Sequence, residues 1–516
     1  MIWKVLKPAV RKVAGALLGV AFAGMSVGTA AAGQLVLKNT SQAPITCTVD
    51  GWTVATGAPF DWYVTVNPGE PFYVGPNTQR AGGPVINWAQ CGALKTRAMA
   101  ITPSGPDQTL VLNGQQTRVL NASLYAYLPT LPGGDFTSLV AYVVQTYQAQ
   151  NPQVLLNAVM NPNLDIYDYG ALPGLLGPQG FDVMELDMLY LGFLASQNLI
   201  NPATITGEAP LDVARAAASY NGQLWAIPSW LCMDFIYSPN AAVQQATTLD
   251  SMVQFLSTMP AGKPELGAVY NGSWRLPSIY INSYVQTYGY GAIAQATQMP
   301  PAQAPINNLI KLTDTCAVGS TNNCTNGVYK SAQDNQNGSI EKYYATGQTS
   351  GNMDFSEQTF YVNLYGDAPI YVTPGTWGNY PQPLLYADAF VSSSANCQPS
   401  TPCGSDATAF TTLMTGVAMK NYITSSQDLP AGTPWRTLLV ANANFWNQPQ
   451  IQNNGLYRQF ARVLPTAQPF PNTITAEQQT QMKGQVCTAL QAQRPAYACT
   501  PAAQTAAAGD QQGARR

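Results

Sequence analysis

Hydrophobic and polar residues follow two different patterns along the chain, and the change between them falls near residue 121. Beyond it, apolar runs of strand length are followed by segments in which apolar residues recur every three or four positions. Residues 124–128 and 181–187 have the first pattern, and residues 136–150 and 188–194 have the second. This alternation predicts an α/β region with a mainly parallel sheet, whose functional side chains lie at the carboxyl ends of the strands.

The segment 33–120 has shorter apolar runs, separated by turn-forming sequences that contain Asn, Pro and Gly. The runs at 35–37, 63–66 and 109–112 are typical of strands between turns. We therefore expect a small β domain, of unknown role, ahead of an α/β region that spans residues 121–500.

The first 32 residues have the composition of a secretory signal peptide. Four basic residues among the first twelve precede an apolar run at 13–27, and three alanines follow at 30–32. The apolar run is too short for a comfortable membrane span. We expect a secreted or periplasmic protein, with no membrane span in the mature chain and a disordered tail at residues 501–516.

The composition excludes several classes of function. Of 516 residues only 9% are charged, and 23 basic residues against 26 acidic ones leave a net charge of −3, which offers no case for nucleic-acid binding. The chain has no histidine, which excludes Ser-His-Asp and Cys-His catalysis and imidazole metal sites. Any catalysis must therefore use carboxylates, a thiol, tyrosines or lysine.

Nine cysteines leave one without a partner. In an oxidising compartment the other eight would form disulfides, and cysteines that are neighbours in the sequence are the expected partners. The expected pairs are Cys47 with Cys91, Cys316 with Cys324, Cys397 with Cys403, and Cys487 with Cys499. Cys232 remains, and two interpretations of it are open: an inert core thiol, or a nucleophile that a nearby base deprotonates.

One long stretch of the chain carries only negative charge. Between Val119 and Ala214 there is no Lys or Arg, but there are eight acidic residues, namely Asp135, Asp165, Asp168, Asp182, Glu185, Asp187, Glu208 and Asp212. Either these acids are solvated on one face, or, since several lie among aromatic and aliphatic residues, they line a cleft for a cationic aromatic ligand.

Several motifs, taken in order, resemble a known family. Residues 220–228, Tyr-Asn-Gly-Gln-Leu-Trp-Ala-Ile-Pro, resemble a turn and strand that are common in bacterial extracellular solute-binding proteins. The region from residue 121 to 500 resembles thiaminase I (thiamine pyridinylase), an exported enzyme family built on that fold. The resemblance implies a two-lobed, type II periplasmic-binding-protein-like α/β fold with mainly parallel sheets, and the small β domain lies outside it.

The resemblance also implies roles for individual residues. The segment 227–232, Ile-Pro-Ser-Trp-Leu-Cys, matches the nucleophile segment of the family and makes Cys232 the nucleophile. The segment 355–357, Phe-Ser-Glu, matches the segment of the catalytic base and makes Glu357 that base, although Phe355 stands where the family has Tyr. The residues implied to bind the substrate are Asp187, Asp388, Asp212, Tyr125, Tyr127, Tyr167 and Tyr386, and Asp165 begins the matching Asp-x-Tyr motif.

The chemistry implied by the family is base exchange by covalent catalysis. A thiolate adds to C6 of the thiamine pyrimidine, the neutral thiazole departs, and a second nucleophile attacks the methylene carbon before the thiolate leaves. The second nucleophile is an amine, a pyridine, a thiol or water. The expected partners are thus thiamine and a small nucleophilic co-substrate, and the route requires no metal and no organic cofactor.

Two other functions fit the same residues. The first is a non-catalytic solute-binding protein for thiamine or a related cationic heteroaromatic ligand, in which Cys232 is only a core residue. The second is a secreted protein whose N-terminal β domain adheres to a surface. Asp212 also has a simpler interpretation, because it can cap a helix that begins near Val213.

Overall fold

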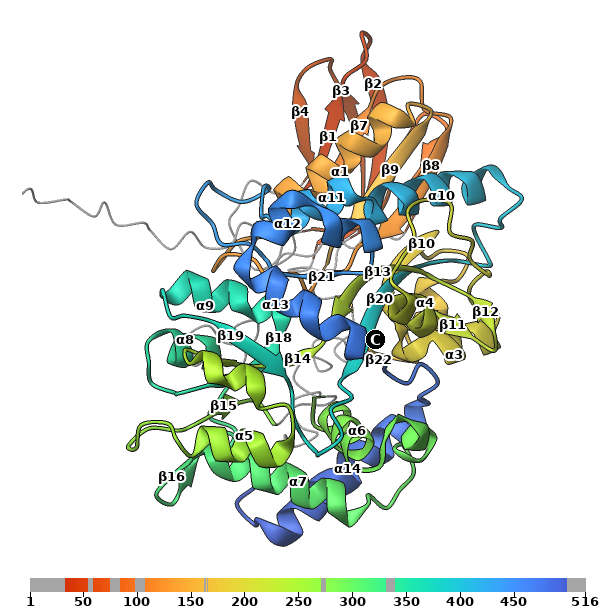
Figure 1. The fold of residues 1–516 in the computed structure, drawn as a ribbon. Coiled ribbons are helices and arrows are strands. Elements are labelled where there is room, and N and C mark those ends of the chain that lie inside the picture. Colours follow the sequence, from red (N-terminus) through yellow and green to blue (C-terminus); the bar gives the residue numbers. More distant parts are fainter. Residues whose placement is uncertain are drawn as a thin grey trace, which may run out of the picture.

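The structure is a computed structural model that describes residues 33–53, 59–74, 84–97, 107–161, 164, 166–270, 275–330 and 339–498. It consists of a small β domain and two lobes (Figure 1). The expected signal peptide and C-terminal tail lie outside the described residues, and so does Asp165. No helix of the described part is both long enough and apolar enough to cross a membrane.

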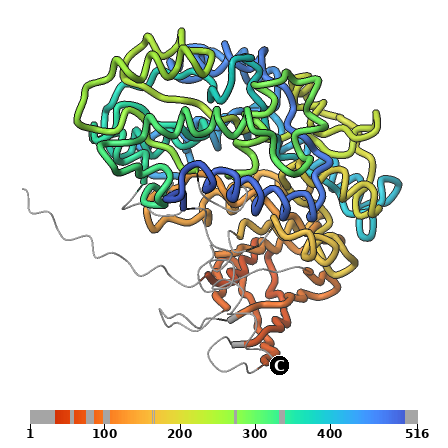
Figure 2. Tube along the Cα trace, turned by 90° about the horizontal axis from the view of Figure 1, so that it is seen from below, coloured from red at the N-terminus to blue at the C-terminus, as the bar shows by residue number. Residues whose placement is uncertain are grey.

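The small β domain stands at one end of the molecule, red to orange in Figure 1, and projects from the body in Figure 2. Its two sheets have the strand orders β4-β1-β7 and β3-β2-β5-β6. The strands are β1 (Leu35–Asn39), β2 (Ile45–Thr53), β3 (Pro59–Val66), β4 (Pro71–Val74), β5 (Pro84–Cys91), β6 (Leu94–Lys95) and β7 (Gln108–Leu112). The predicted small β domain is therefore confirmed.

The core of the β domain lies between its sheets and continues into the first lobe. Buried Leu35, Leu37 and Val49 pack with Leu155, which belongs to a strand of that lobe. The predicted disulfide Cys47–Cys91 joins β2 to β5 at positions that face each other in register. Strand β8 (Arg118–Ser123) already belongs to the first lobe, and the domain limit that we place after residue 120 stays a prediction.

The first lobe is built on one sheet with the order β21-β13-β20-β10-β8-β9, and β22 pairs with β20. Its strands are β8 (Arg118–Ser123), β9 (Val154–Val159), β10 (Val183–Asp187), β13 (Ile227–Cys232), β20 (Leu384–Ser392), β21 (Leu439–Val440) and β22 (Gln468–Pro469). The helices α1 (Thr137–Gln150), α4 (Asp212–Ala217), α10 (Pro402–Thr415) and α11 (Val417–Thr424) contribute to its core. Helix α1 forms where the predicted apolar spacing places Leu139, Val140 and Val143 on its buried face.

The second lobe has a four-stranded sheet with the order β15-β18-β14-β19. Its main elements are β14 (Asp234–Ser238), β15 (Gly267–Ala268), β18 (Asn352–Phe355), β19 (Tyr371–Pro374), α5 (Leu249–Leu256), α6 (Arg275–Tyr288), α7 (Gln303–Thr313), α9 (Thr359–Tyr365) and α14 (Ala476–Gln493). The predicted disulfide Cys316–Cys324 follows α7. Two lobes, each with its own sheet and helices, confirm the expected two-lobed α/β fold.

The sheets are mixed, so the expectation of mainly parallel sheets is wrong. In the first lobe β8 is parallel to β9 and β10, but β20 is antiparallel to both β10 and β13. In the second lobe β14 is antiparallel to both of its neighbours. The physical reason is the path of the chain: β13 leads into the second lobe, and β20 returns from it in the opposite direction.

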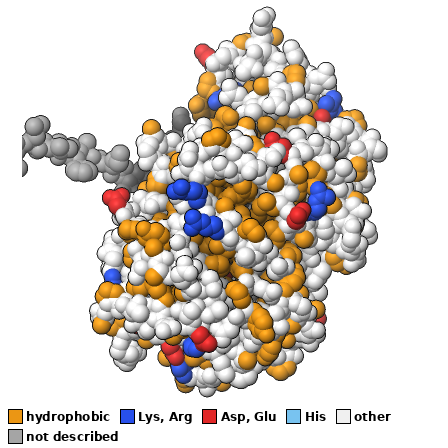
Figure 3. Space-filling view, viewed as in Figure 1, with side chains coloured by type: hydrophobic (Ala, Val, Ile, Leu, Met, Phe, Trp, Pro, Cys, Tyr) orange, Lys and Arg blue, Asp and Glu red, His pale blue; other side chains and the backbone are white. Residues whose placement is uncertain are grey.

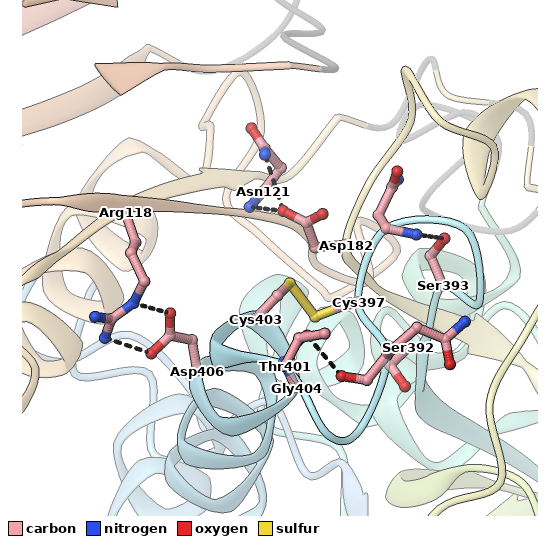
Figure 4. The surroundings of a disulfide bond; sticks show 12 residues. Arg118, Asn121, Asp182, Ser392, Ser393, Cys397, Thr401, Cys403, Gly404 and Asp406 are labelled. Carbon is pink, nitrogen blue, oxygen red and sulfur yellow. Dashed lines mark hydrogen bonds and ion pairs between the residues drawn. A yellow bond between two sulfur atoms is a disulfide. The ribbon is translucent and has the colours of Figure 1, made fainter. Parts of the chain in front are cut away.

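A disulfide and an ion pair attach helix α10 to the rest of the first lobe, as Figure 4 shows. The disulfide Cys397–Cys403 fastens the chain at the beginning of α10. The Arg118 guanidinium of β8 donates to Asp406 of α10 at 2.8 and 3.0 Å. The fourth predicted disulfide is described at one end only: Cys487 is disulfide-bonded, and Cys499 lies outside the described residues.

The surface carries few charges, in agreement with the composition. Figure 3 shows apolar side chains gathered over the middle of one face, in the region where the two lobes of Figure 1 meet. The chain crosses between the lobes in this region, because only Met233 separates the end of β13 from the start of β14.

Candidate active site

Cys232 is the last residue of β13 and lies at the crossing between the lobes. Its thiol is free and half-buried, and its Sγ lies 3.8 Å from Oδ2 of Asp388. The three predicted disulfides that lie wholly in the described residues are present, as expected if Cys232 is the cysteine left over. The thiol is neither bonded to another cysteine nor sealed away from acidic groups.

The acids Asp187 and Asp388 form a pair on the first-lobe sheet. Strand β20 lies between β10 and β13, and Asp388 faces Asp187 on one side and Trp230 on the other. Directly opposite residues in a sheet project from the same face, so the two carboxyls share one face with the Trp230 ring. Asp187 also caps the short helix that follows β10, because its Oδ1 accepts the Leu189 N–H at 3.0 Å.

Glu357 comes from the second lobe, directly after β18. Its side chain is buried, and its Oε2 accepts the Ser356 hydroxyl at 3.1 Å. Burial raises the pKa of Glu357 to about 7, and the nearby charge of Asp354 contributes to the rise. A carboxyl that titrates near neutrality has the basicity that a general base requires.

The thiol and the three acids influence one another electrostatically. Burial raises the pKa of the Cys232 thiol well above its ordinary value, and the charges of Glu357, Asp388 and Asp187 raise it further. Burial raises the pKa of Asp187 to about 7, and burial together with the Asp187 charge raises that of Asp388. The structure therefore brings all four groups into one site, where an additional positive charge would be stabilised.

Three tyrosines predicted to bind the substrate lie beside these acids. The ring of Tyr127 lies 5.3 Å from that of Tyr125 and 5.9 Å from that of Tyr167. Burial raises the pKa of Tyr125, and the charge of Asp388 adds to the rise. In Tyr167 burial and the charge of Asp187 have the same effect. These rings therefore form an aromatic wall next to the thiol and the acid pair.

Tyr386 closes another side of the site. It faces Cys232 in the β13–β20 pairing, and its hydroxyl accepts the Asn282 side-chain N–H at 2.9 Å. Its ring packs against Phe470 at 4.4 Å and against Phe355 at 5.9 Å. Phe355 is the residue that replaces the Tyr implied by the resemblance. It thus contributes an apolar edge to the side of the site that Tyr386 closes.

Comparison with solved structures finds the same fold. The chain resembles thiaminase I from Clostridium botulinum in complex with thiamin, at 16% identity and a TM-score of 0.58, over 72% of this chain and 100% of that one. It also resembles thiaminase I from Bacillus thiaminolyticus, at 17% identity and a TM-score of 0.55, over 72% and 99%. The resemblance to thiaminase I is confirmed at the level of the fold.

The fold is shared with binding proteins as well. The maltose-bound structure of T. maritima MalE3 resembles this chain at 12% identity and a TM-score of 0.53, over 77% of this chain and 100% of that one. No protein-family model and no curated protein matches the chain. At these identities the likeness establishes the two-lobed fold, and the activity has to be argued from the site.

The structure places Asp212 differently from the other predicted acids. Asp212 is exposed and is the first residue of helix α4. Among the described residues, no hydrogen bond or ion pair joins it to Cys232, Asp187 or Asp388. Its negative charge is favourable at the N-terminus of the helix. Its role in substrate binding stays a prediction.

Two buried charged residues beside the site were not singled out from the sequence: Glu185, which was only one of the eight acids of the stretch without Lys or Arg, and Lys420. Glu185 lies on the same strand as Asp187, two residues earlier, and the period of two along a strand places both side chains on one face. That alternation could have identified Glu185. Lys420 lies on α11, far along the chain, and no local pattern links it to the site.

No group of three or more cysteine or acidic side chains in the described residues is arranged to hold a metal ion. The groups that are present can carry out nucleophilic addition, proton transfer, and recognition of a flat ring by carboxyls and aromatic faces.

Proposed function

We propose that this protein is an exported transferase that degrades thiamine by base exchange, with Cys232 as the nucleophile and Glu357 as the base. The observation that carries the proposal is the free Cys232 thiol at the crossing between the lobes, 3.8 Å from Asp388 and within the field of Glu357 from the opposite lobe. The fold shared with thiaminase I supports it.

The site suits both halves of thiamine. The Asp187–Asp388 pair offers carboxyl groups that hydrogen-bond the ring nitrogens and amino group of the aminopyrimidine. The wall of Tyr125, Tyr127 and Tyr167 provides faces and edges for a flat ring. The positively charged thiazolium is stabilised because acids dominate the field at the thiol.

Binding of the cation also prepares the nucleophile. Burial and three acids hold the pKa of the Cys232 thiol high, so the thiol is protonated before substrate binds. A thiazolium beside the thiol supplies the missing positive charge and lowers the pKa of the thiol. Glu357 then accepts the thiol proton, and the thiolate sulfur forms a bond to C6 of the pyrimidine.

The remaining steps conserve atoms and charge. The electron pair that the ring gains forms a double bond to the methylene carbon, and the pair of the broken C–N bond leaves with the nitrogen of the now neutral thiazole. An incoming amine, pyridine, thiol or water then bonds to the methylene carbon and, where it carries a proton, gives that proton to a base. The C–S bond breaks, the ring becomes aromatic again, and the Cys232 thiolate is released.

A second candidate is a non-catalytic binding protein for thiamine or a related cation. The observation that favours it is the raised pKa of the Cys232 thiol, which keeps the sulfur in its unreactive form in the empty site. The fold shared with a maltose-bound protein is compatible with this function.

One experiment separates the two candidates. The purified protein is incubated with thiamine and aniline, and release of the free thiazole alcohol is measured for the wild type and for Cys232→Ser. We expect turnover by the wild type and none by Cys232→Ser, with thiamine binding retained in the variant. Binding without wild-type turnover would favour the binding protein, and near-wild-type activity of Cys232→Ser would remove the nucleophile assignment.

A further inference from the structure

A buried lysine lies next to the candidate site without being part of the proposed reaction. Lys420 of α11 is fully buried, and its ammonium lies 3.2 Å above the centre of the Trp230 ring. Its Nζ donates a hydrogen bond to the Ser229 hydroxyl at 2.5 Å. Since an uncompensated buried ammonium costs several kcal/mol, a negative partner must be close by.

Glu185 is that partner, and Ser229 connects the two charges. The Ser229 hydroxyl donates to Oε1 of Glu185, and Oε2 of Glu185 accepts the backbone N–H of Tyr125 at 2.9 Å. Ser229 reaches Glu185 because β13 has a bulge between Pro228 and Trp230, and a bulge redirects a side chain. Both oxygens of the buried carboxylate are therefore occupied.

Residues of this network lie close in sequence or space to site residues on three strands, β10, β13 and β20, and on the segment that follows β8. Glu185 is two residues before Asp187 on β10, Ser229 is three residues before Cys232 on β13, and the Glu185 carboxylate holds the backbone of Tyr125. The charges of Glu185 and Lys420 also act on Asp388 of β20. The groups that face Lys420 are thus Glu185, Ser229, Trp230 and Asp388.

We propose that Lys420 is a positioning residue of this site: through Ser229 it fixes the Glu185 carboxylate, and this carboxylate in turn holds the backbone of Tyr125 beside the Asp187–Asp388 pair. The proposal rests on the proposed function for its substrate, thiamine. It assigns Lys420 no contact with the substrate, because the side chain is fully buried.

Removing the lysine charge has a definite consequence. Without the ammonium, Ser229 loses its donor and Glu185 is a buried carboxylate with no counter-charge, which is a destabilising arrangement. The unbalanced carboxylate turns toward water or other donors and gives up the Ser229 hydroxyl and the Tyr125 N–H, so the backbone of Tyr125 loses its fixed position beside the acid pair. Replacing Glu185 by Gln at the same time removes the unbalanced charge, while the amide oxygen still accepts the Tyr125 N–H.

The test compares Lys420→Met, the double variant Lys420→Met/Glu185→Gln, and Lys311→Met. Lys311 is a matched control, because it is an exposed lysine on α7 that pairs with Asp250 at the surface. The KM and kcat for thiamine with aniline are measured against pH. We expect Lys420→Met to raise KM about tenfold, the double variant to recover to within about threefold of the wild type, and Lys311→Met to stay within about twofold.

The second measurement is thermal unfolding against pH without substrate, which does not depend on thiamine turnover. Burial lowers the pKa of Lys420 to about 7, partly offset by Glu185 and Asp388, so the unfolded chain binds more protons than the folded one between pH 7 and about 10. The unfolding temperature of the wild type should therefore rise with pH across this range, relative to that of Lys420→Met.

The outcomes are distinguishable. A folded Lys420→Met with the KM and pH profile of the wild type would overturn the proposal, and so would a folded double variant with a KM no better than that of the single one. If Lys420→Met does not fold, the KM and pH profile of the double variant are compared with those of the wild type, and a KM outside about threefold of the wild type would overturn the proposal. A wild type without thiamine turnover would refute the proposed function instead, and the double variant's unfolding temperature would then decide the charge coupling alone.

Discussion

Each lobe contains a buried cluster of acids around one basic residue, and the positive charge is paired differently in the two clusters. The first-lobe cluster consists of Glu185, Asp187, Asp388 and Lys420, and the second-lobe cluster of Asp234, Asp354, Glu357, Glu341 and Arg275. In the first-lobe cluster a hydroxyl, that of Ser229, bridges the ammonium and the Glu185 carboxylate. In the second-lobe cluster the guanidinium pairs directly with Asp234 and lies 3.9 Å from Asp354.

The difference shows in the pKa values of the two basic groups. Burial lowers the pKa of Lys420 to about 7, and Glu185 and Asp388 offset the change only in part. Burial would also lower the pKa of Arg275, but Asp234 and Asp354 together raise it above its ordinary value. A planar guanidinium that meets two carboxylates and lies 4.5 Å above the Phe355 ring keeps its charge. Arg275 therefore forms a permanent ion pair, while Lys420 can titrate.

The largest effect is expected from breaking the permanent ion pair. Arg275→Met leaves Asp234 and Asp354 as buried carboxylates without a counter-charge, which should lower the free energy of unfolding by about 3–5 kcal/mol in chemical denaturation. Arg494→Met, which breaks the exposed pair with Asp314, is the control and should cost less than about 1 kcal/mol. Equal losses in the two variants would remove the distinction that we draw.

Within the second-lobe cluster, Glu357 is the member with a proposed chemical role. Glu357→Gln should lower kcat about a hundredfold with a smaller change in KM, because the amide cannot accept the thiol proton. Burial raises the pKa of Glu357 to about 7, so the wild-type rate should fall as the pH drops below 7 and the base becomes protonated. Steady-state rates against pH test this, and an unchanged kcat would mean that another group is the base.

Glu357 and Lys420 should contribute to the pH dependence of stability with opposite signs. The folded protein binds the Glu357 proton up to about pH 7, while in the unfolded chain this proton dissociates near pH 4.5. Wild-type stability should therefore fall between pH 4.5 and 7 relative to Glu357→Gln, whereas Lys420 makes it rise above pH 7 relative to Lys420→Met. Denaturation midpoints of the three proteins against pH decide the signs.

The smallest effects are expected outside both clusters. Asp212→Asn removes an exposed charge at the start of α4, which should cost less than about 1 kcal/mol of stability and leave the KM for thiamine within about twofold. Asp187→Asn, inside the first-lobe cluster, is the comparison. It should raise KM about tenfold, because the hydrogen bond between the buried Asp187 carboxylate and the aminopyrimidine is lost. If Asp212→Asn raises KM as much as Asp187→Asn does, Asp212 belongs to the site.

Local patterns predicted the features of this protein that depend on neighbouring residues. Counting cysteines identified Cys232 as the free thiol, and short sequence separations identified the bonds Cys316–Cys324 and Cys397–Cys403. The short apolar runs between turns ahead of residue 121 predicted the small β domain. Such features can be predicted from the sequence because they depend mainly on residues that are close together along the chain.

The direction of β20 and the partners of Cys232 were decided by contacts between distant segments. The sequence contains Asp187 and Asp388 as separate strand residues, but the antiparallel return of β20 places them side by side. The Lys420–Ser229–Glu185 network joins three elements whose burial only the packed lobe creates. A single sequence therefore determined which groups are reactive, while the tertiary structure decided their charges, because solvation and charge separation depend on the completed packing.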